Sequence, residues 1–265
     1  MKIAVVLNAH NHTDIVLDTI HSIHTYVTKN ILVVVDGCSW KSWGENVQLP
    51  AYKMQGMNHG HIKGPYRNLT LGLMNVSKLF SDVDWYCYCE YDVLFANDHF
   101  KQDLEEMSKH NVWVVGADAR IENMKFPLLE AMLNEKIEKS HYTLGCCVFY
   151  HRDFIFKLHE LNFYERFLNL TNDFPRDFFP QFEEQGGYDL GEHLYPTLAG
   201  HYGGKVAGFS AYKKDVGIWT GNYRRYPLRW KPELDITENF PESSILHPVK
   251  KVDHPIRQER RLERI

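Results

Sequence analysis

The sequence has no long hydrophobic run. Its first run, Ile3–Leu7, holds five apolar residues before polar ones begin. This is too short for the hydrophobic part of a signal peptide or for a membrane span. We therefore expect a cytoplasmic protein without a transmembrane segment, in which this run forms a buried strand.

Cysteine is scarce and lacks the spacing of metal-binding motifs. The sequence contains neither CxxC pairs nor zinc-finger spacing among its five cysteines, Cys38, Cys87, Cys89, Cys146 and Cys147. An odd set of this kind argues against a disulfide framework. We expect buried thiols in a reducing compartment.

Positive charge is not in excess. The chain has 30 Lys and Arg against 34 Asp and Glu, a net charge of -4, so we expect no nucleic-acid partner. The basic tail at Arg257–Arg264 leaves peripheral contact with a membrane open, although Glu259 and Glu263 interrupt its charge.

Several catalytic signatures are also missing. HExxH, Gly-x-Ser-x-Gly and clustered His/Asp motifs are absent, which ranks a metal-dependent hydrolase last among the function classes. The turn after the first expected strand, Asn8–Thr13, contains no glycine. A nucleotidyltransferase would usually have a glycine-rich phosphate loop there, so this class stays only as an alternative.

The apolar content suffices for a large core. Of the 265 residues, 44% are hydrophobic and 14% aromatic, which fits one large α/β domain. The β-branched runs at 2–7 and 31–35 predict buried parallel strands, and the apolar spacing over 15–23 predicts a helix between them.

Polar side chains follow both strands. Asn8 and His10 come after the first, and Asp36 comes after the second. We expect them side by side at the carboxyl edge of the sheet, where open α/β sheets bind ligands. Each has a structural alternative: Asn8 and His10 could cap the next helix, and Asp36 could close an Asx turn with Gly37.

The rest of the chain continues the alternation of helices and strands. The apolar patterns predict helices over 66–80, 100–110 and 189–199 and strands over 84–92, 112–116 and 142–150. No internal repeat or long linker separates independent domains.

Two acids end the aromatic strand at 84–92. Glu90 and Asp92 are spaced i,i+2, so they would share a face if the strand stayed extended. Two carboxylates beside a buried strand need a cation or hydrogen-bond donors, and a hard divalent metal carrying phosphates meets that need. This pair predicts a nucleotide-phosphate site.

Three motifs together resemble a known family. Val35-Asp36-Gly37, Tyr66-Arg67-Asn68 and the strand Trp85–Asp92 look like those of GT-A glycosyltransferases, nearest to the family 2 kind. The resemblance implies a GT-A (Rossmann-like) α/β fold with a mixed, mostly parallel central sheet flanked by helices in a single compact domain. It also implies that residues 1–130 form the nucleotide-sugar-binding half. Residues 131–265 would form the acceptor-binding half, with a C-terminal metal and lid segment.

The resemblance also implies roles for individual residues. In this family a short acidic motif, commonly Asp-x-Asp, binds ribose and metal, and here it reads Glu90-Tyr91-Asp92. By resemblance Asp92 and His247 hold Mn²⁺ or Mg²⁺. The nucleotide sugar would contact Asn8, His10, Asp36, Arg67 and Glu90.

The expected catalytic base lies in the segment 183–193. Gly186-Gly187 stands where the family often has a Glu-Asp pair. The resemblance favours Asp189 as the base that removes the acceptor proton, with a helix N-cap as its structural alternative. Glu184 and Glu192 are the other candidates.

The sequence therefore predicts a metal-dependent glycosyltransferase. It would transfer a sugar from a nucleoside diphosphate sugar to a hydroxyl of a glycan, glycolipid or other acceptor, with inversion by resemblance. The alternatives are a non-catalytic nucleotide- or carbohydrate-binding protein of the same fold and a nucleotidyltransferase.

Overall fold

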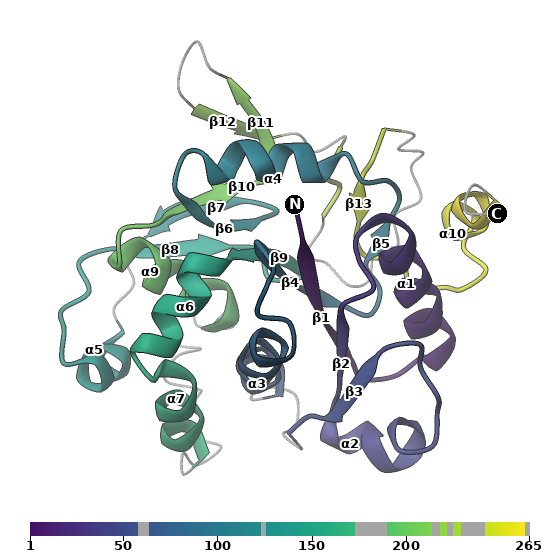
Figure 1. The fold of residues 1–265 in the computed structure, drawn as a ribbon, viewed down its shortest axis with the longest axis horizontal. Coiled ribbons are helices and arrows are strands. Elements are labelled where there is room, and N and C mark those ends of the chain that lie inside the picture. Colours follow the sequence, from purple (N-terminus) through teal and green to yellow (C-terminus); the bar gives the residue numbers. More distant parts are fainter. Residues whose placement is uncertain are drawn as a thin grey trace.

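The computed structural model describes residues 1–57, 64–122, 126–172, 190–213, 218–221, 225–228 and 242–262. Its elements follow one another in the order (Figure 1) β1 (Ile3–Ala9), α1 (Thr13–Tyr26), β2 (Ile31–Val35), α2 (Gly37–Ser39), the π-helical turn η1 (Trp40–Gly44), β3 (Tyr52–Gln55), α3 (Gly64–Leu79), β4 (Trp85–Glu90), β5 (Leu94–Phe95), α4 (Phe100–Ser108), β6 (Val112–Gly116), β7 (Ala119–Glu122), α5 (Pro127–Leu133), β8 (Ser140–Thr143), β9 (Cys147–His151), α6 (Arg152–Glu160), α7 (Phe163–Asn172), α9 (Leu190–His201), β10 (Lys205–Gly208), β11 (Ser210–Lys213), β12 (Ile218–Gly221), β13 (Ile245–Leu246) and α10 (Pro255–Leu262).

The centre of the fold is a seven-stranded sheet with the strand order β10-β6-β9-β4-β1-β2-β3. β9 runs antiparallel to both of its neighbours, β4 and β6, and the other pairs are parallel. β2 is buried at every residue, as expected for a parallel strand covered on both faces. The predicted α/β fold with a mixed, mostly parallel sheet is confirmed.

Helices cover both faces of this sheet. α1 and α4 pack their apolar side chains on one face, and α3, α5, α6, α7 and α9 pack on the other. In Figure 1, α4 lies above the sheet and α3 below it. α3 approaches closely at Gly72, where a Cβ atom would lie 2.4 Å from Val6 Cγ1. A larger residue there would push the helix away from β1.

One predicted element is wrong. The stretch 142–150 was expected to be a single strand, but it forms the end of β8 and most of β9, separated by a turn at residues 144–146. β8 pairs with β7, whereas β9 pairs with β4 and β6. The chain must therefore leave one sheet and enter another at this turn, and apolar composition does not report such a break.

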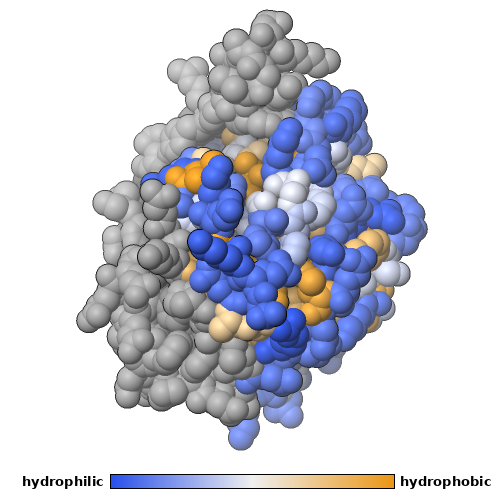
Figure 2. All heavy atoms as spheres, turned by 90° about the vertical axis from the view of Figure 1, so that its left-hand side faces the viewer, coloured by the Kyte–Doolittle hydropathy of each residue, from blue (hydrophilic) through white to orange (hydrophobic). Residues whose placement is uncertain are grey.

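The helices at 66–80 and 100–110 are found as α3 and α4. The helix at 189–199 is found as α9, which begins at Leu190. Figure 2 faces the left-hand side of Figure 1, and hydrophilic side chains predominate over its coloured surface. Among the described residues, no helix combines the length and the apolar character needed to cross a bilayer.

Candidate functional site

The predicted polar residues meet at one edge of the sheet. Asn8 pairs in register with Val34 of β2 on one side and with Glu90 of β4 on the other. The backbone N–H of Asp36 donates to Ala9 O at 2.8 Å. The carboxyl ends of β2, β1 and β4 thus bring these side chains together, as the sequence predicted.

Asp36 is buried and held by local contacts. Its Oδ1 accepts the backbone N–H of Cys38 at 2.9 Å, so the Asx turn is present. His10 Nδ1 lies 3.8 Å from the same oxygen, and Asn68 Nδ2 donates to Oδ2 at 3.4 Å. A carboxylate has about four lone-pair sites, so these contacts leave room for a ligand.

Asn8 and Arg67 have different surroundings. The Oδ1 atom of Asn8 is a buried acceptor without a hydrogen-bond partner, a feature that suits the donor groups of a nucleobase or ribose. Arg67 is buried in α3, and its Nη2 donates to the carbonyl of Leu168 in α7 at 3.3 Å. Burial lowers the pKa of Arg67. Its role at a nucleotide stays a prediction.

Glu90 and Asp92 converge, although not for the reason inferred from the sequence. β4 ends at Glu90, and a turn follows in which Val93 N donates to Glu90 O at 3.2 Å. The two carboxylates therefore do not share the face of one extended strand. They nevertheless both reach the imidazole of His247, whose Nε2 lies 3.3 Å from Glu90 Oε2 and 3.3 Å from Asp92 Oδ1.

A short ladder brings His247 to the acids. β13 ends immediately before His247 and pairs antiparallel with β5. β5 in turn begins two residues after Asp92. Just beyond this ladder, Val249 N donates to Asp92 O at 2.9 Å. These backbone bonds fix the position of His247 relative to the turn at residues 90–93, which we call the acidic turn.

The residues Glu90, Asp92 and His247 form what we call the candidate metal centre. One ligand atom from each lies within 4.8 Å of the other two. Asp92 Oδ1 is buried and faces the His247 imidazole, while the Glu90 side chain is 42% exposed and gives access from solvent. Two carboxylates suit a hard divalent cation, and the imidazole favours Mn²⁺ over Mg²⁺, so the residues present fit a divalent cation.

The centre has an unusual electrostatic balance. Burial alone would raise the pKa of Asp92, but its hydrogen bond to His247 and the charge of the imidazole lower it. Burial alone would lower the pKa of His247, whereas its contacts with Cys146, Asp92 and Glu90 raise it well above its ordinary value. Burial raises the pKa of the Cys146 thiol to about 11. Without a metal ion, the imidazole carries the positive charge that the carboxylates require.

We expect manganese affinity to fall as the pH is lowered. A metal ion binds only the neutral imidazole, and the raised pKa of His247 keeps its ring protonated up to a higher pH than usual. Binding should therefore release about one proton per ion, measurable by titration calorimetry in two buffers of different ionisation enthalpy. The His247→Asn variant is the control, and equal proton release from it would contradict the assignment.

The raised pKa also affects folding. In the absence of metal, a histidine whose pKa is raised by folding stabilises the protein fully below the unfolded value of about 6.5. This contribution is lost as the pH rises through the raised pKa of His247.

A further carboxylate lies close to the centre. Glu192 is buried in the first turn of α9, and its Oε1 accepts the backbone N–H of Gly145 at 2.6 Å. Cys146, which follows Gly145 in the chain, accepts the backbone N–H of Glu90 through its carbonyl oxygen at 3.0 Å. Of the predicted catalytic acids, Asp189 and Glu184 lie outside the described residues, and the structure brings Glu192 to the turn that holds Glu90.

The cysteines are all free thiols. Four of them are buried, and Cys38 is exposed. No sequence pattern signals the contact of Cys146 with His247, because this contact depends on the break between β8 and β9.

The chain is similar to several solved structures at low sequence identity. No protein-family model matches the chain, and no curated protein matches it. Similar solved structures include the glycosyltransferase GlyE of Streptococcus pneumoniae TIGR4 (10% identity, TM-score 0.39, covering 79% of this chain and 45% of that one). Another is a glycosyltransferase involved in the glycosylation of the major capsid of PBCV-1 (13% identity, TM-score 0.43, 98% and 99%).

A third similar structure is TarS residues 1–349 of S. aureus (15% identity, TM-score 0.36, 60% and 49%). The chain thus spans about half the length of two of these structures and nearly all of the capsid enzyme. Two of the three are described as glycosyltransferases. At these TM-scores the likeness carries no further conclusion, so function must be inferred from the site.

Proposed function

We propose that the protein is a metal-dependent glycosyltransferase that uses a nucleoside diphosphate sugar. The observation that carries this proposal is the convergence of Glu90, Asp92 and His247 at the sheet edge where Asn8 and Asp36 also lie. A diphosphate needs a cation, and the adjoining buried acceptors suit a nucleoside. The centre and the polar strand ends would then bind two parts of one ligand.

The candidate metal centre would hold Mn²⁺ or Mg²⁺ through Glu90, Asp92 and His247. A divalent cation bound there would supply stabilisation of the negative charge on the departing diphosphate. Asn8, His10 and Asp36 would orient the nucleoside, and Glu90 lies between the two regions. Lys250 lies near enough to Asp92 to lower its pKa, and it would add positive charge beside the diphosphate.

Glu192 is the described carboxylate that best suits the role of base. It would take the proton of the acceptor hydroxyl while the hydroxyl oxygen bonds to the anomeric carbon and the bond to the diphosphate oxygen breaks. Such a direct displacement inverts the anomeric carbon, and it needs a single base near the acceptor. Asp189 remains the alternative predicted from the sequence.

The same residues support a division of the chain into two functional halves. Asn8, Asp36 and Glu90 come from residues 1–130, whereas Glu192 and His247 come from residues 131–265. We propose that the first half binds the nucleotide sugar and that the second binds the acceptor and completes the metal centre.

Thermal unfolding with nucleotides tests the proposal. We expect one of UDP, GDP, CDP and ADP to raise the Tm in the presence of manganese and not in the presence of EDTA. At about 100 times the Kd, mass action contributes about 2.7 kcal/mol, which for a chain of this size is a rise on the order of 5–10 °C. No rise with any nucleotide would contradict a nucleotide-sugar enzyme.

Product analysis separates the alternatives. Nucleotide binding without turnover of any nucleotide sugar would identify a non-catalytic binding protein. Release of inorganic pyrophosphate from a nucleoside triphosphate would identify a nucleotidyltransferase.

A further inference from the structure

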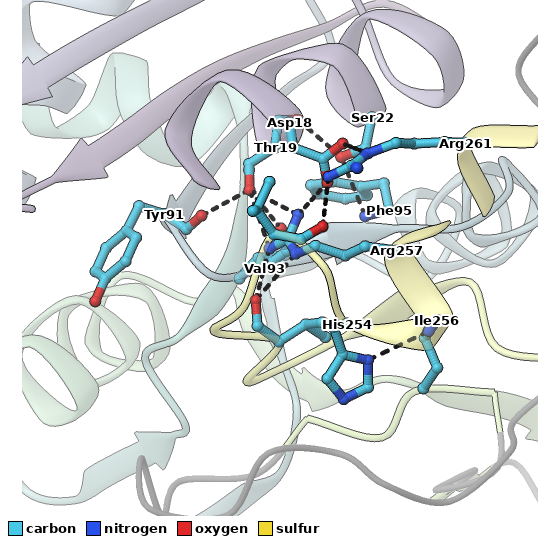
Figure 3. A network of polar contacts seen from close by, with 12 residues as sticks. Asp18, Thr19, Ser22, Tyr91, Val93, Phe95, His254, Ile256, Arg257 and Arg261 are labelled. Carbon is cyan, nitrogen blue, oxygen red and sulfur yellow. Dashed lines mark hydrogen bonds and ion pairs between the residues drawn. The ribbon is translucent and has the colours of Figure 1, made fainter. Parts of the chain in front are cut away.

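A fully buried arginine lies behind the acidic turn. Arg257 of α10 has no exposed surface. Its Nη1 donates to Asp18 Oδ2 of α1 at 2.6 Å, and its Nε and Nη2 donate to the carbonyl of Val249 at 3.0 and 2.8 Å. Figure 3 shows the guanidinium between α1 and the chain that leads to α10. A planar guanidinium suits this task because it offers several donors in fixed directions.

Thr19 carries the contact from Arg257 to the acidic turn. Its Oγ1 lies 3.4 Å from both Nη1 and Nη2 of Arg257. The same hydroxyl donates toward the carbonyls of Tyr91 at 2.6 Å and Val93 at 3.1 Å. These are the residues on either side of Asp92, and in Figure 3 the Tyr91 ring points away from the network. The hydroxyl therefore holds the backbone that presents the Asp92 carboxylate.

The contacts close into a ring. Val249 accepts from Arg257 through its carbonyl and donates to Asp92 O through its N–H at 2.9 Å. Val249 also follows His247 by two residues. The ring, which we define as Thr19, the residues 91–93, Val249 and Arg257, thus fixes two of the three ligands of the candidate metal centre relative to each other.

We propose that Thr19 and Arg257 are positioning residues for the candidate metal centre, and that docking of α10 and binding of the metal ion stabilise each other. This inference rests on the proposed function, because it needs a metal ion at the centre. Outer partners that orient metal ligands commonly set metal affinity. Coupling free energy between two sites is reciprocal. If docking of α10 strengthens metal binding, binding of the metal ion must therefore stabilise the docked α10 by the same free energy.

Substitutions at Thr19 distinguish positioning from packing. Valine keeps the shape of threonine without its hydroxyl, whereas serine keeps the hydroxyl and loses a methyl group. We expect Thr19→Val to weaken Mn²⁺ binding by about tenfold or more and Thr19→Ser to stay near wild type. The Kd is measured from the electron paramagnetic resonance signal of free Mn²⁺, with the Tm of each variant recorded without metal.

A matched pair of arginines on α10 gives a second test. Arg261 Nε also pairs with Asp18, at 2.7 Å from Oδ1, but its side chain is 37% exposed and its Nη2 donates to Val252 O. Arg257→Lys keeps the charge and loses the fork that joins Asp18 to Val249. We expect it to weaken Mn²⁺ binding by about tenfold, while Arg261→Lys changes it less than about twofold.

Hydrogen exchange tests the reciprocal effect. In the wild-type protein, saturating Mn²⁺ should slow exchange of the amides in 256–262, and the slowing should be smaller in Thr19→Val. Equal Mn²⁺ affinity in wild type, Thr19→Val and Arg257→Lys would overturn the inference, as would a larger loss in Thr19→Ser than in Thr19→Val. Failure of the wild-type protein to bind Mn²⁺ would instead overturn the proposed function.

Discussion

Asp92→Asn should weaken Mn²⁺ binding by at least about 100-fold, more than the loss of an outer partner usually causes. The substitution keeps the size of the side chain but removes a buried charge that lies 3.3 Å from His247. The imidazole would then lose a partner that raises its pKa, so the number of protons released on Mn²⁺ binding should fall as well. Titration calorimetry with Mn²⁺ measures both effects.

Asp84→Asn is the control for this variant. Asp84 lies just before β4, at the end opposite the candidate metal centre, and its Oδ2 accepts the backbone N–H of Lys2 at 2.7 Å. We expect it to bind Mn²⁺ as the wild type does. Unchanged affinity in Asp92→Asn would show that the three residues do not form a metal site.

Glu192→Gln should lower kcat by about 10²- to 10⁴-fold, the usual contribution of a general base. The amide keeps an oxygen that can accept from Gly145 N, so the turn before β9 should stay in place. The Tm rise with nucleotide and manganese should also stay near that of the wild type. Initial rates of sugar transfer, measured alongside thermal unfolding, separate catalysis from binding.

Glu130→Gln is the matched control. Glu130 Oε1 likewise accepts a backbone N–H, from Ile137 at 2.9 Å, but it lies in α5. We expect nearly wild-type rates from it. If Glu192→Gln were as active as the wild type, Asp189 would become the leading candidate for the base.

The strands could be predicted where an apolar, β-branched composition coincides with burial inside the sheet. β1 and β2 are β-branched runs buried in a parallel sheet, so their existence followed from these continuous runs, and the placement of Asn8 and Asp36 followed from the shared carboxyl edge of parallel strands. The carboxylates of Glu90 and Asp92 were also found, although a turn brings them together rather than the alternation of a strand.

The rest depended on contacts between distant segments. Thr19 fitted the apolar spacing of α1, but spacing does not show that its hydroxyl reaches Tyr91 O and Val93 O. The sequence places Arg257 in a basic tail with possible membrane contact, whereas the structure buries it against Asp18. A buried ion pair has no local signature, because each partner alone looks like a surface residue.

The direction of β9 decides which part of the chain reaches the site. In the register of the sheet Cys147 lies opposite Cys89, so β9 starts where β4 finishes. A strand running parallel to β4 would have carried His151 and the start of α6 to that edge. Because β9 is antiparallel, the turn that precedes it lies at this edge instead. This turn contains Gly145 and Cys146, and the backbone N–H of Gly145 binds the Glu192 carboxylate. With β9 antiparallel to β4, the second half of the chain therefore places Glu192 and Cys146 at an edge of the sheet formed by β1, β2 and β4.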